Sequence, residues 1–207
     1  MNDGAESFQK FGQYSRSTYG FVLSLFSSRM TPFTFMLDFY AYPVFIIIAL
    51  GIGAWGLRHD IWWHGPVLLI LGYAIWTLVE YFMHRYVFHH MPGVKPLHMA
   101  HHADAHDLIG QPTIISFTLI LVLGYLPSVY LFGAYAACFP FVGLMAGYLA
   151  FSSVHFIVHH AAQSRFKFVR QLKRGHAIHH YGNNQFNFGV TTLFWDRVFG
   201  TYSDKMR

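Results

Sequence analysis

The stretch "FYAYPVFIIIALGIGAWGL" (residues 39–57) runs for 19 residues without Asp, Glu, Lys or Arg. At a rise of about 1.5 Å per residue it makes a helix of about 28 Å, enough to cross a hydrocarbon core of roughly 30 Å. Residues 61–79 are equally long and equally free of these charges. Both stretches therefore predict membrane-spanning helices, joined by a tight hairpin at "RHD" (residues 58–60).

A longer stretch, residues 108–164, also lacks Asp, Glu, Lys and Arg. It is long enough for two more spans, and Gly133 with Pro140 predicts the break between them. Pro127 lies inside the first of these spans, where neighbouring helices tolerate a kink. The whole chain is 54% hydrophobic and 11% charged, against about 25% charged in soluble domains. The sequence predicts an all-α integral membrane protein with four transmembrane helices.

The N-terminal part of the chain is expected to stay outside the bilayer core. We expect residues 1–38 to form a cytosolic or interfacial segment and residues 39–207 a single membrane domain. Residues 7–35 combine Phe and Tyr with scattered Arg and Lys, which suits a helix lying in the interface. The opening "MNDGAES" is acidic and polar and has no signal-peptide pattern.

The basic residues predict the orientation. In a four-span arrangement Arg58 alone falls on one side of the membrane, and every other Lys and Arg falls on the opposite side. The positive-inside rule then places both termini in the cytosol, at the inner membrane of a bacterium or the endoplasmic reticulum of a eukaryote. The net charge of +5 is explained by this topology, so nucleic acid is not an expected partner. The single cysteine, Cys138, excludes an intramolecular disulfide and a thiolate metal cluster.

Histidine is unusually abundant, with 15 residues against 9 Asp plus Glu. Thirteen histidines fall on the predicted cytosolic side, whereas His59 and His64 fall on the other. Two segments repeat one spacing, "HMAHH" (98–102) and "HAIHH" (176–180), which places three imidazoles on one helical face. Ten imidazoles are too many for one ion and predict two metals. The ten candidates are His84, His89, His98, His101, His102, His155, His159, His176, His179 and His180.

The first pair among these candidates does not fit one helical face. His84 and His89 are five residues apart, which separates them by about 140° on an ideal α-helix. Either the helix ends between them, or the two imidazoles bind different metals.

Other interpretations of the histidines remain at this point. His90, His106 and His160 are individually as well explained by capping or by reaching the interface. Three other kinds of metal protein fit the sequence less well. Structural zinc sites are usually closed and thiolate-bearing, and a zinc hydrolase usually has an H-E-x-x-H motif, which this sequence lacks. A transporter places its ligands near the bilayer midplane, whereas these histidines are predicted at span ends. By elimination, a paired metal site that opens toward lipid suits oxidation of a hydrophobic chain by O₂.

Four segments carry a resemblance to a known family: "EYFMHRYVFHH" (80–90), "HMAHH", "VHFIVHH" (154–160) and "GHAIHHYGNNQFNFGVTTLFWDRVFGTY" (175–202). Their order and spacing resemble the fatty acid hydroxylase superfamily of membrane di-iron enzymes, from about Tyr73 to the C-terminus. The resemblance implies a cytosolic helical cap in which the same ten histidines bind two iron ions, although such sites also accept zinc in purified protein. It further implies O₂-dependent hydroxylation of a fatty acid or sphingolipid at carbon 2. A sterol or carotenoid hydroxylase or desaturase is the alternative within the superfamily, and a membrane metal-binding or transport protein the alternative outside it.

Departures from the family pattern concern the substrate and the electron donor. The chain is short between His89 and His98, and "ADAHDLIGQPT" (103–113) lacks the usual proline pattern. We expect no fused cytochrome b5 domain and therefore a separate donor, cytochrome b5-like or ferredoxin-like with a reductase. A basic patch could dock this donor or anchor the chain at the membrane, and it comprises Arg165, Lys167, Arg170, Lys173 and Arg174.

Polar side chains near the histidine segments are candidates for orienting the imidazoles by hydrogen bonds. They are Glu80, Asp104, Asp107, Asn183, Asn187 and Asp196. For Asp196 a salt bridge to a basic residue is an equally good expectation.

Overall fold

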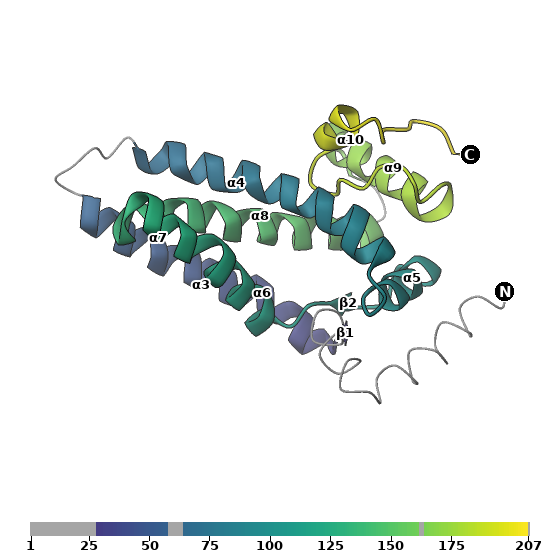
Figure 1. Ribbon diagram of the computed structural model, residues 1–207. Coiled ribbons are helices and arrows are strands. Elements are labelled where there is room, and N and C mark those ends of the chain that lie inside the picture. The colour runs from purple at the N-terminus through teal and green to yellow at the C-terminus, as the bar shows by residue number, and fades with distance from the viewer. Residues whose placement is uncertain (1–27, 58–63, 162–163, 207) are drawn as a thin grey trace. The chain divides into compact units, whose positions relative to one another are not determined.

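The computed structural model describes residues 28–57, 64–161 and 164–206 of the chain. Nearly all of this is helical, which confirms the predicted all-α class (Figure 1). The chain divides into two compact units. The membrane unit comprises Pro32–Leu78 and Thr113–Ala150, and the described part of the histidine unit comprises residues 28–31, Val79–Pro112 and residues 151–206.

Four helical stretches are long and apolar enough to cross a membrane: Pro32–Gly56, His64–Phe88, Thr113–Phe132 and Ala134–His160. The first is α3 (Pro32–Leu57), and the second joins α4 (His64–Phe82) to the π-helix η1 (Met83–Phe88). The third runs through α6 (Thr113–Ile120), the π-helix η2 (Leu121–Tyr125) and α7 (Leu126–Phe132). The fourth is α8 (Ala134–His160).

The third and fourth spans separate where the sequence predicts a break. Gly133 takes a φ of 80°, a left-handed conformation that glycine adopts without steric cost. Pro140 instead lies inside α8. Pro127 lies in the first turn of α7, directly after the π-helix η2 and inside the continuous third span, as the sequence predicts.

The first span begins at Pro32, before the expected Phe39. It therefore includes an acidic residue, Asp38, whose carboxylate is buried. Asp38 is 6% exposed and accepts hydrogen bonds from Thr113 Oγ1 and Tyr148 OH, each at 2.6 Å. Tyr42, one helical turn further along α3, donates to Ser116 Oγ at 2.8 Å. These polar contacts join α3 to α6 and α8, so a charged residue does not end the helix.

Glycines let the backbones of α4 and α8 approach closely within the membrane unit. A Cβ added to Gly72 would lie 2.1 Å from Pro140 O, and one added to Gly143 would lie 2.1 Å from Leu69 O. Small residues at such crossings are the usual means of packing helices in a bilayer. The apolar core around them includes Tyr42, Phe141 and Met145.

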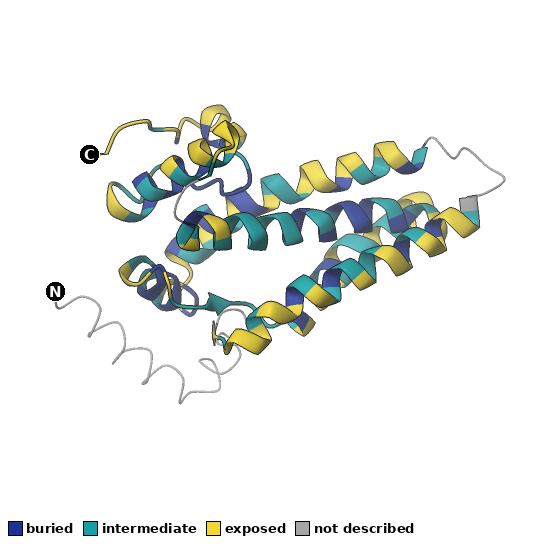
Figure 2. Ribbon diagram, turned by 180° about the vertical axis from the view of Figure 1, so that it is seen from behind, coloured by how far each residue is buried: buried dark blue, intermediate teal, exposed yellow. Residues whose placement is uncertain are grey.

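Large apolar side chains remain exposed along the spanning helices, as the yellow segments of Figure 2 show. Tyr130 is 91% exposed, Leu123 72% and Ile47 68%. Patches of this kind are unfavourable in water but match lipid chains.

The histidine unit contains α5 (Lys95–Ala103), α9 (Lys167–Tyr181) and α10 (Phe194–Val198). Its two short strands, β1 (Ser28–Arg29) and β2 (Ile109–Gly110), pair antiparallel, with Ser28 opposite Gly110. Of the predicted interfacial helix, residues 7–27 lie outside the described residues, and the remainder forms β1 and the start of α3.

Candidate metal centre

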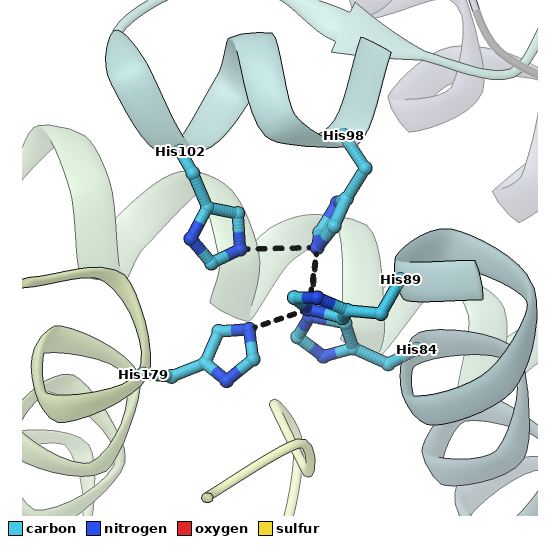
Figure 3. A group of neighbouring side chains, drawn as sticks. All are labelled: His84, His89, His98, His102 and His179. Atoms are coloured by element: carbon cyan, nitrogen blue, oxygen red, sulfur yellow. Dashed lines mark hydrogen bonds between the residues drawn. The ribbon is translucent and has the colours of Figure 1, made fainter. Parts of the chain in front are cut away.

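Five imidazoles from three elements form a first group. Their ligand atoms all lie within 4.8 Å of one another. Figure 3 shows the five rings pointing toward a common centre. η1 and the residue that follows it supply two rings, α5 supplies two, and α9 supplies one. The members are His84, His89, His98, His102 and His179.

Five further imidazoles form a second group with the same spread of ligand atoms, within 4.8 Å. The end of α8 supplies two of these rings, α9 supplies two, and α5 supplies one. His101 Nε2 lies 3.1 Å from the Nε2 atoms of both His155 and His159. The members are His101, His155, His159, His176 and His180.

The repeated H-x-x-H-H spacing divides its histidines between the two groups. In α5, the first and last histidines join the first group and His101 joins the second. In α9 the division is reversed, because His176 and His180 join the second group and His179 joins the first. The groups adjoin, since the rings of His102 and His180 stack with centroids 4.1 Å apart. Each repeat therefore contributes to both groups, which the spacing alone does not reveal.

The pair His84 and His89 departs from both outcomes expected from the sequence. The helix does not end between the two residues, and they do not separate into different groups. The chain instead widens into the π-helix η1 (Met83–Phe88), in which residue i bonds to residue i+5. Residues five apart then lie almost above one another, so both imidazoles face the same side.

The nitrogen atoms of the first group are arranged for a cation. His98 Nε2 lies 3.2 Å from His84 Nε2, 3.0 Å from His89 Nε2 and 3.1 Å from His102 Nε2. A single N–H on His98 can serve only one of these three neighbours. The remaining contacts bring lone pairs together, and a shared metal ion relieves this repulsion. The donor set therefore fits a metal site.

Burial keeps the imidazoles outside the spans neutral, which is the form that binds metal. It lowers the pKa of His89 to about 3, that of His102 to about 2, and those of His101 and His179 to about 4. The pKa values of His98 and His176 also fall well below the ordinary value for the same reason, and neighbouring histidines lower them further.

Two backbone carbonyls orient imidazoles of the first group. The Nδ1 atom of His84 lies 2.5 Å from Phe188 O, and that of His179 lies 2.8 Å from Phe186 O. A carbonyl only accepts, so Nδ1 carries the proton in each ring and Nε2 keeps its lone pair for a metal. Sequence reasoning missed these groups because a backbone carbonyl leaves no signature in residue type.

The six polar side chains predicted to orient imidazoles make their hydrogen bonds elsewhere. Asp104 accepts from the His106 N–H at 3.0 Å, Asp107 pairs with Arg29 at 2.7 Å, and Asn183 accepts from the Gln185 N–H at 2.9 Å. Glu80 and Asp196 accept from backbone N–H groups of residues 188–191, and the Asn187 side chain bonds to backbone groups of Ser203 and Gly175. Asp196 forms no salt bridge with the described residues; this buried carboxylate accepts from the Phe188 and Gly189 N–H groups at 2.8 and 2.9 Å.

Three histidines that the sequence left open lie outside both groups. His90 Nδ1 lies 2.9 Å from Arg85 O, and His160 Nδ1 lies 3.1 Å from Phe156 O. The backbone N–H of His106 donates to the Asp104 side chain. Of the two histidines predicted to lie on the opposite side of the membrane, His64 begins α4, whereas His59 lies outside the described residues.

Comparison with known proteins places the chain in a family. The model of the fatty acid hydroxylase family, described as "Fatty acid hydroxylase", matches residues 69–201. Ceramide very long chain fatty acid hydroxylase SCS7 of Saccharomyces cerevisiae is 38% identical over 152 residues, which cover 65% of this chain and 38% of the relative. Dihydroceramide fatty acyl 2-hydroxylase FAH1 of Arabidopsis thaliana is 30% identical over 148 residues, covering 65% of this chain and 60% of the relative. Human fatty acid 2-hydroxylase is 27% identical over 148 residues, covering 66% of this chain and 39% of the relative.

The fold agrees with a solved structure, "Full length scs7p (only hydroxylase domain visible)". The two structures superpose with a TM-score of 0.68 at 27% sequence identity. The superposition covers 82% of this chain and 67% of the chain in the solved structure. The matched part of the chain spans 38% of the length of the Saccharomyces relative. The resemblance read from the histidine segments is confirmed: the chain is an integral membrane protein that belongs to the fatty acid hydroxylase family.

Proposed function

We propose that this protein is an O₂-dependent oxidoreductase that hydroxylates the acyl chain of a fatty acid or sphingolipid at carbon 2. The observation that carries the proposal is the pair of five-imidazole groups in a membrane protein of this family. The names of the relatives, which include ceramide and fatty acid 2-hydroxylases, support carbon 2 over a sterol or carotenoid. Ligands at span ends rather than at mid-span disfavour a transporter.

The ten histidines would hold two iron ions, one in each group. Bound iron supplies the one-electron chemistry with which O₂ is reduced and an unactivated C–H bond is oxidised. The residues of the chain keep the imidazoles neutral, fix their direction and limit access of water to the site. Because imidazole also binds zinc, the same groups would accept zinc in purified protein.

The orientation and the electron donor belong to the same proposal. The positive-inside rule favours a cytosolic metal centre with both termini in the cytosol. A separate donor with an acidic surface would dock on the basic patch at α9. Part of that patch is already engaged with the chain: Arg170 donates to Arg165 O at 2.7 Å, and Arg174 donates to Asp204 O at 2.8 Å. These bonds to neutral carbonyls fix the two guanidinium groups but leave their positive charge available to an acidic partner.

A lipid profile tests the activity. The protein is expressed in a host that makes no 2-hydroxylated acyl chains, and its lipids are compared with those of cells that express His176→Ala. We expect 2-hydroxy acyl chains with the native protein alone. A change confined to sterols or carotenoids would overturn the proposed substrate.

Metal analysis tests the cofactor. Protein purified without chelators should contain two metal ions per chain, with iron predominating when cells are grown with iron. Fewer than two ions per chain would contradict a two-metal centre.

A further inference from the structure

The two histidine groups differ in what holds their imidazoles. In the first group, the carbonyls of Phe186 and Phe188 accept from the Nδ1 atoms of His179 and His84. The Phe188 ring also packs against this group, with its centroid 5.8 Å from His84, 5.6 Å from His89 and 5.4 Å from His179. Residues 186–191 thus contact the first group through both backbone and side chain.

Three rings of the second group lack such a carbonyl within the described part of the chain, and the ring of His155 is packed by Phe151, with centroids 5.6 Å apart. The Nδ1 atoms of His101 and His176 are buried and have no hydrogen-bond partner there. Both nitrogens of His180 are in the same condition. These rings are oriented by packing against neighbouring rings and not by a hydrogen bond to a ring nitrogen.

A strained backbone conformation aims the two carbonyls. Asn187 lies between Phe186 and Phe188 and takes a φ of 55°, in the left-handed region that asparagine tolerates better than most residues. The fully buried Asn187 side chain donates to Ser203 O at 2.8 Å and accepts from the Ser203 N–H at 2.9 Å. Its own N–H donates to Thr201 O at 2.8 Å. The strain is maintained because the surrounding bonds fix this residue.

Two buried carboxylates fix the rest of the segment. Asp196 accepts from the N–H groups of Phe188 and Gly189, and Glu80 accepts from those of Val190 and Thr191 at 2.7 and 2.8 Å. Gly189 has no room for a side chain, because an added Cβ would lie 2.0 Å from Thr192 O. Four consecutive N–H groups are therefore occupied. The bond to the Gly189 N–H holds the peptide plane that carries the Phe188 carbonyl, and the bond of the Asn187 N–H to Thr201 O holds the plane that carries the Phe186 carbonyl.

We infer that residues 186–191 act as a positioning segment for the first histidine group alone, and that the metal ion in this group is consequently held more tightly than the one in the second. Asn187, Asp196 and Glu80 are positioning residues that act through backbone carbonyls. This inference rests on the proposed two-metal centre. It also explains the role of Asp196, which touches no imidazole but binds the Gly189 N–H and so holds the Phe188 carbonyl that contacts His84.

Release of metal from the unmodified protein gives the first test. The full chain in detergent is loaded with two Zn²⁺ per chain, excess chelator is added, and the remaining metal is followed with time. We expect two phases whose rates differ by about 10-fold or more, the range in which groups that orient ligands act. His101→Ala should abolish the fast phase and retain the slow one, and His98→Ala should abolish the slow phase and retain the fast one. Release of both ions at one rate would overturn the inference, whereas a chain that never holds two ions would overturn the proposed function instead.

A variant of the segment gives the second test. Asn187→Ala should accelerate the slow phase about 10- to 100-fold and leave the fast phase unchanged. Asn187→Gly should stay closer to the native rate, because glycine adopts a positive φ freely. Asp107→Asn, which alters an ion pair with Arg29 in the same unit, is the control and should change neither phase.

The pattern of the two phases separates positioning from general loosening. Equal acceleration of both phases by Asn187→Ala, or no acceleration, would show that the segment does not position the first group. If Asn187→Ala does not accumulate as folded protein, Asp196→Asn replaces it. That variant keeps the side-chain size but sets an amide donor against a backbone N–H, and the same selective acceleration is expected.

Discussion

The membrane unit and the histidine unit both bury polar groups, but they satisfy them differently. In the membrane unit the carboxylate of Asp38 is bound by the hydroxyls of Thr113 and Tyr148, and the helices meet at glycines. In the histidine unit ten imidazoles crowd together with their Nε2 atoms as close as 2.9 Å, and buried ring nitrogens of His101, His176 and His180 have no partner among the described residues. Among the described residues, the membrane unit leaves one isolated buried side-chain nitrogen without a partner, Trp76 Nε1, whereas the histidine unit leaves a converging set that a metal would complete.

This difference shows how a structural polar group is told from a functional one. A buried polar group that is fully hydrogen-bonded contributes to stability, whereas a buried set that cannot satisfy itself indicates a missing ligand. Substitutions in the membrane unit should therefore change stability, and substitutions in the histidine unit should change metal content at nearly constant fold.

The largest expected effect is the loss of activity in His176→Ala and His101→Ala. Each removes one imidazole from the second group. The loss should exceed the roughly 10- to 100-fold drop typical of residues that merely orient a ligand. Metal content should fall toward one ion per chain while membrane insertion is retained. His106→Ala, which lies outside both groups, is the control, and turnover retained by either ligand variant would remove that histidine from the centre.

In metal-free protein, acidification should destabilise the histidine unit more than the membrane unit. His101 and His179 have pKa values of about 4 in the folded chain, below the ordinary value of 6.5. Between these values the unfolded chain binds protons that the folded chain does not, so the free energy of unfolding falls as the pH is lowered from 6.5 toward 4.

Hydrogen exchange at pH 7 and pH 5 measures this effect. Amides of α5 and α9 should lose protection at pH 5, after correction for the intrinsic pH dependence of exchange. Those of α3 should not, because His59 and His64 are the only histidines in the sequence of the membrane unit. Bound metal should restore protection, since it occupies the same nitrogens. Equal loss in both units would contradict the comparison.

The sequence predicted the class and the chemistry better than it predicted the assignment of ligands. Charge-free stretches indicated four spans, and Gly133 marked one break, because a bilayer imposes length and apolarity directly on sequence. The early start of α3 was missed because counting charges cannot show that Asp38 is hydrogen-bonded to residues far along the chain.

The details of the metal centre were hidden for related reasons. The placement of His84 and His89 on one side depends on a π-helix, which has no simple sequence pattern. The division of each H-x-x-H-H between two groups depends on how α5 and α9 face each other, a tertiary property. The carbonyls of Phe186 and Phe188 carry no sequence signature at all, although Asn187 between them is a residue type that tolerates a left-handed turn.

Packing in the membrane unit should not tolerate a larger residue at the glycines where α4 and α8 cross. Gly143→Ala places a Cβ 2.1 Å from the carbonyl of Leu69, and backbone cannot move aside as a flexible side chain can. We expect destabilisation at or above the about 1–3 kcal/mol that overpacking usually costs. Gly51→Ala is the matched control, because its Cβ meets nothing within 4 Å. Unfolding of detergent-solubilised protein, followed by circular dichroism, measures the difference, and similar effects of the two variants would show that α4 and α8 do not meet at Gly143.

The smallest effect is expected at Asp38, where two substitutions test whether hydrogen bonding or charge matters. Asp38→Leu leaves the hydroxyls of Thr113 and Tyr148 buried without their acceptor, which costs about 1–3 kcal/mol. Asp38→Asn should cost much less, because each hydroxyl can turn to accept from the new amide as well as donate to its oxygen. Both variants should keep two metal ions per chain. If Asp38→Asn instead lost metal or activity at unchanged stability, the carboxylate would act in the reaction, and the membrane unit would no longer be the purely structural member of the pair.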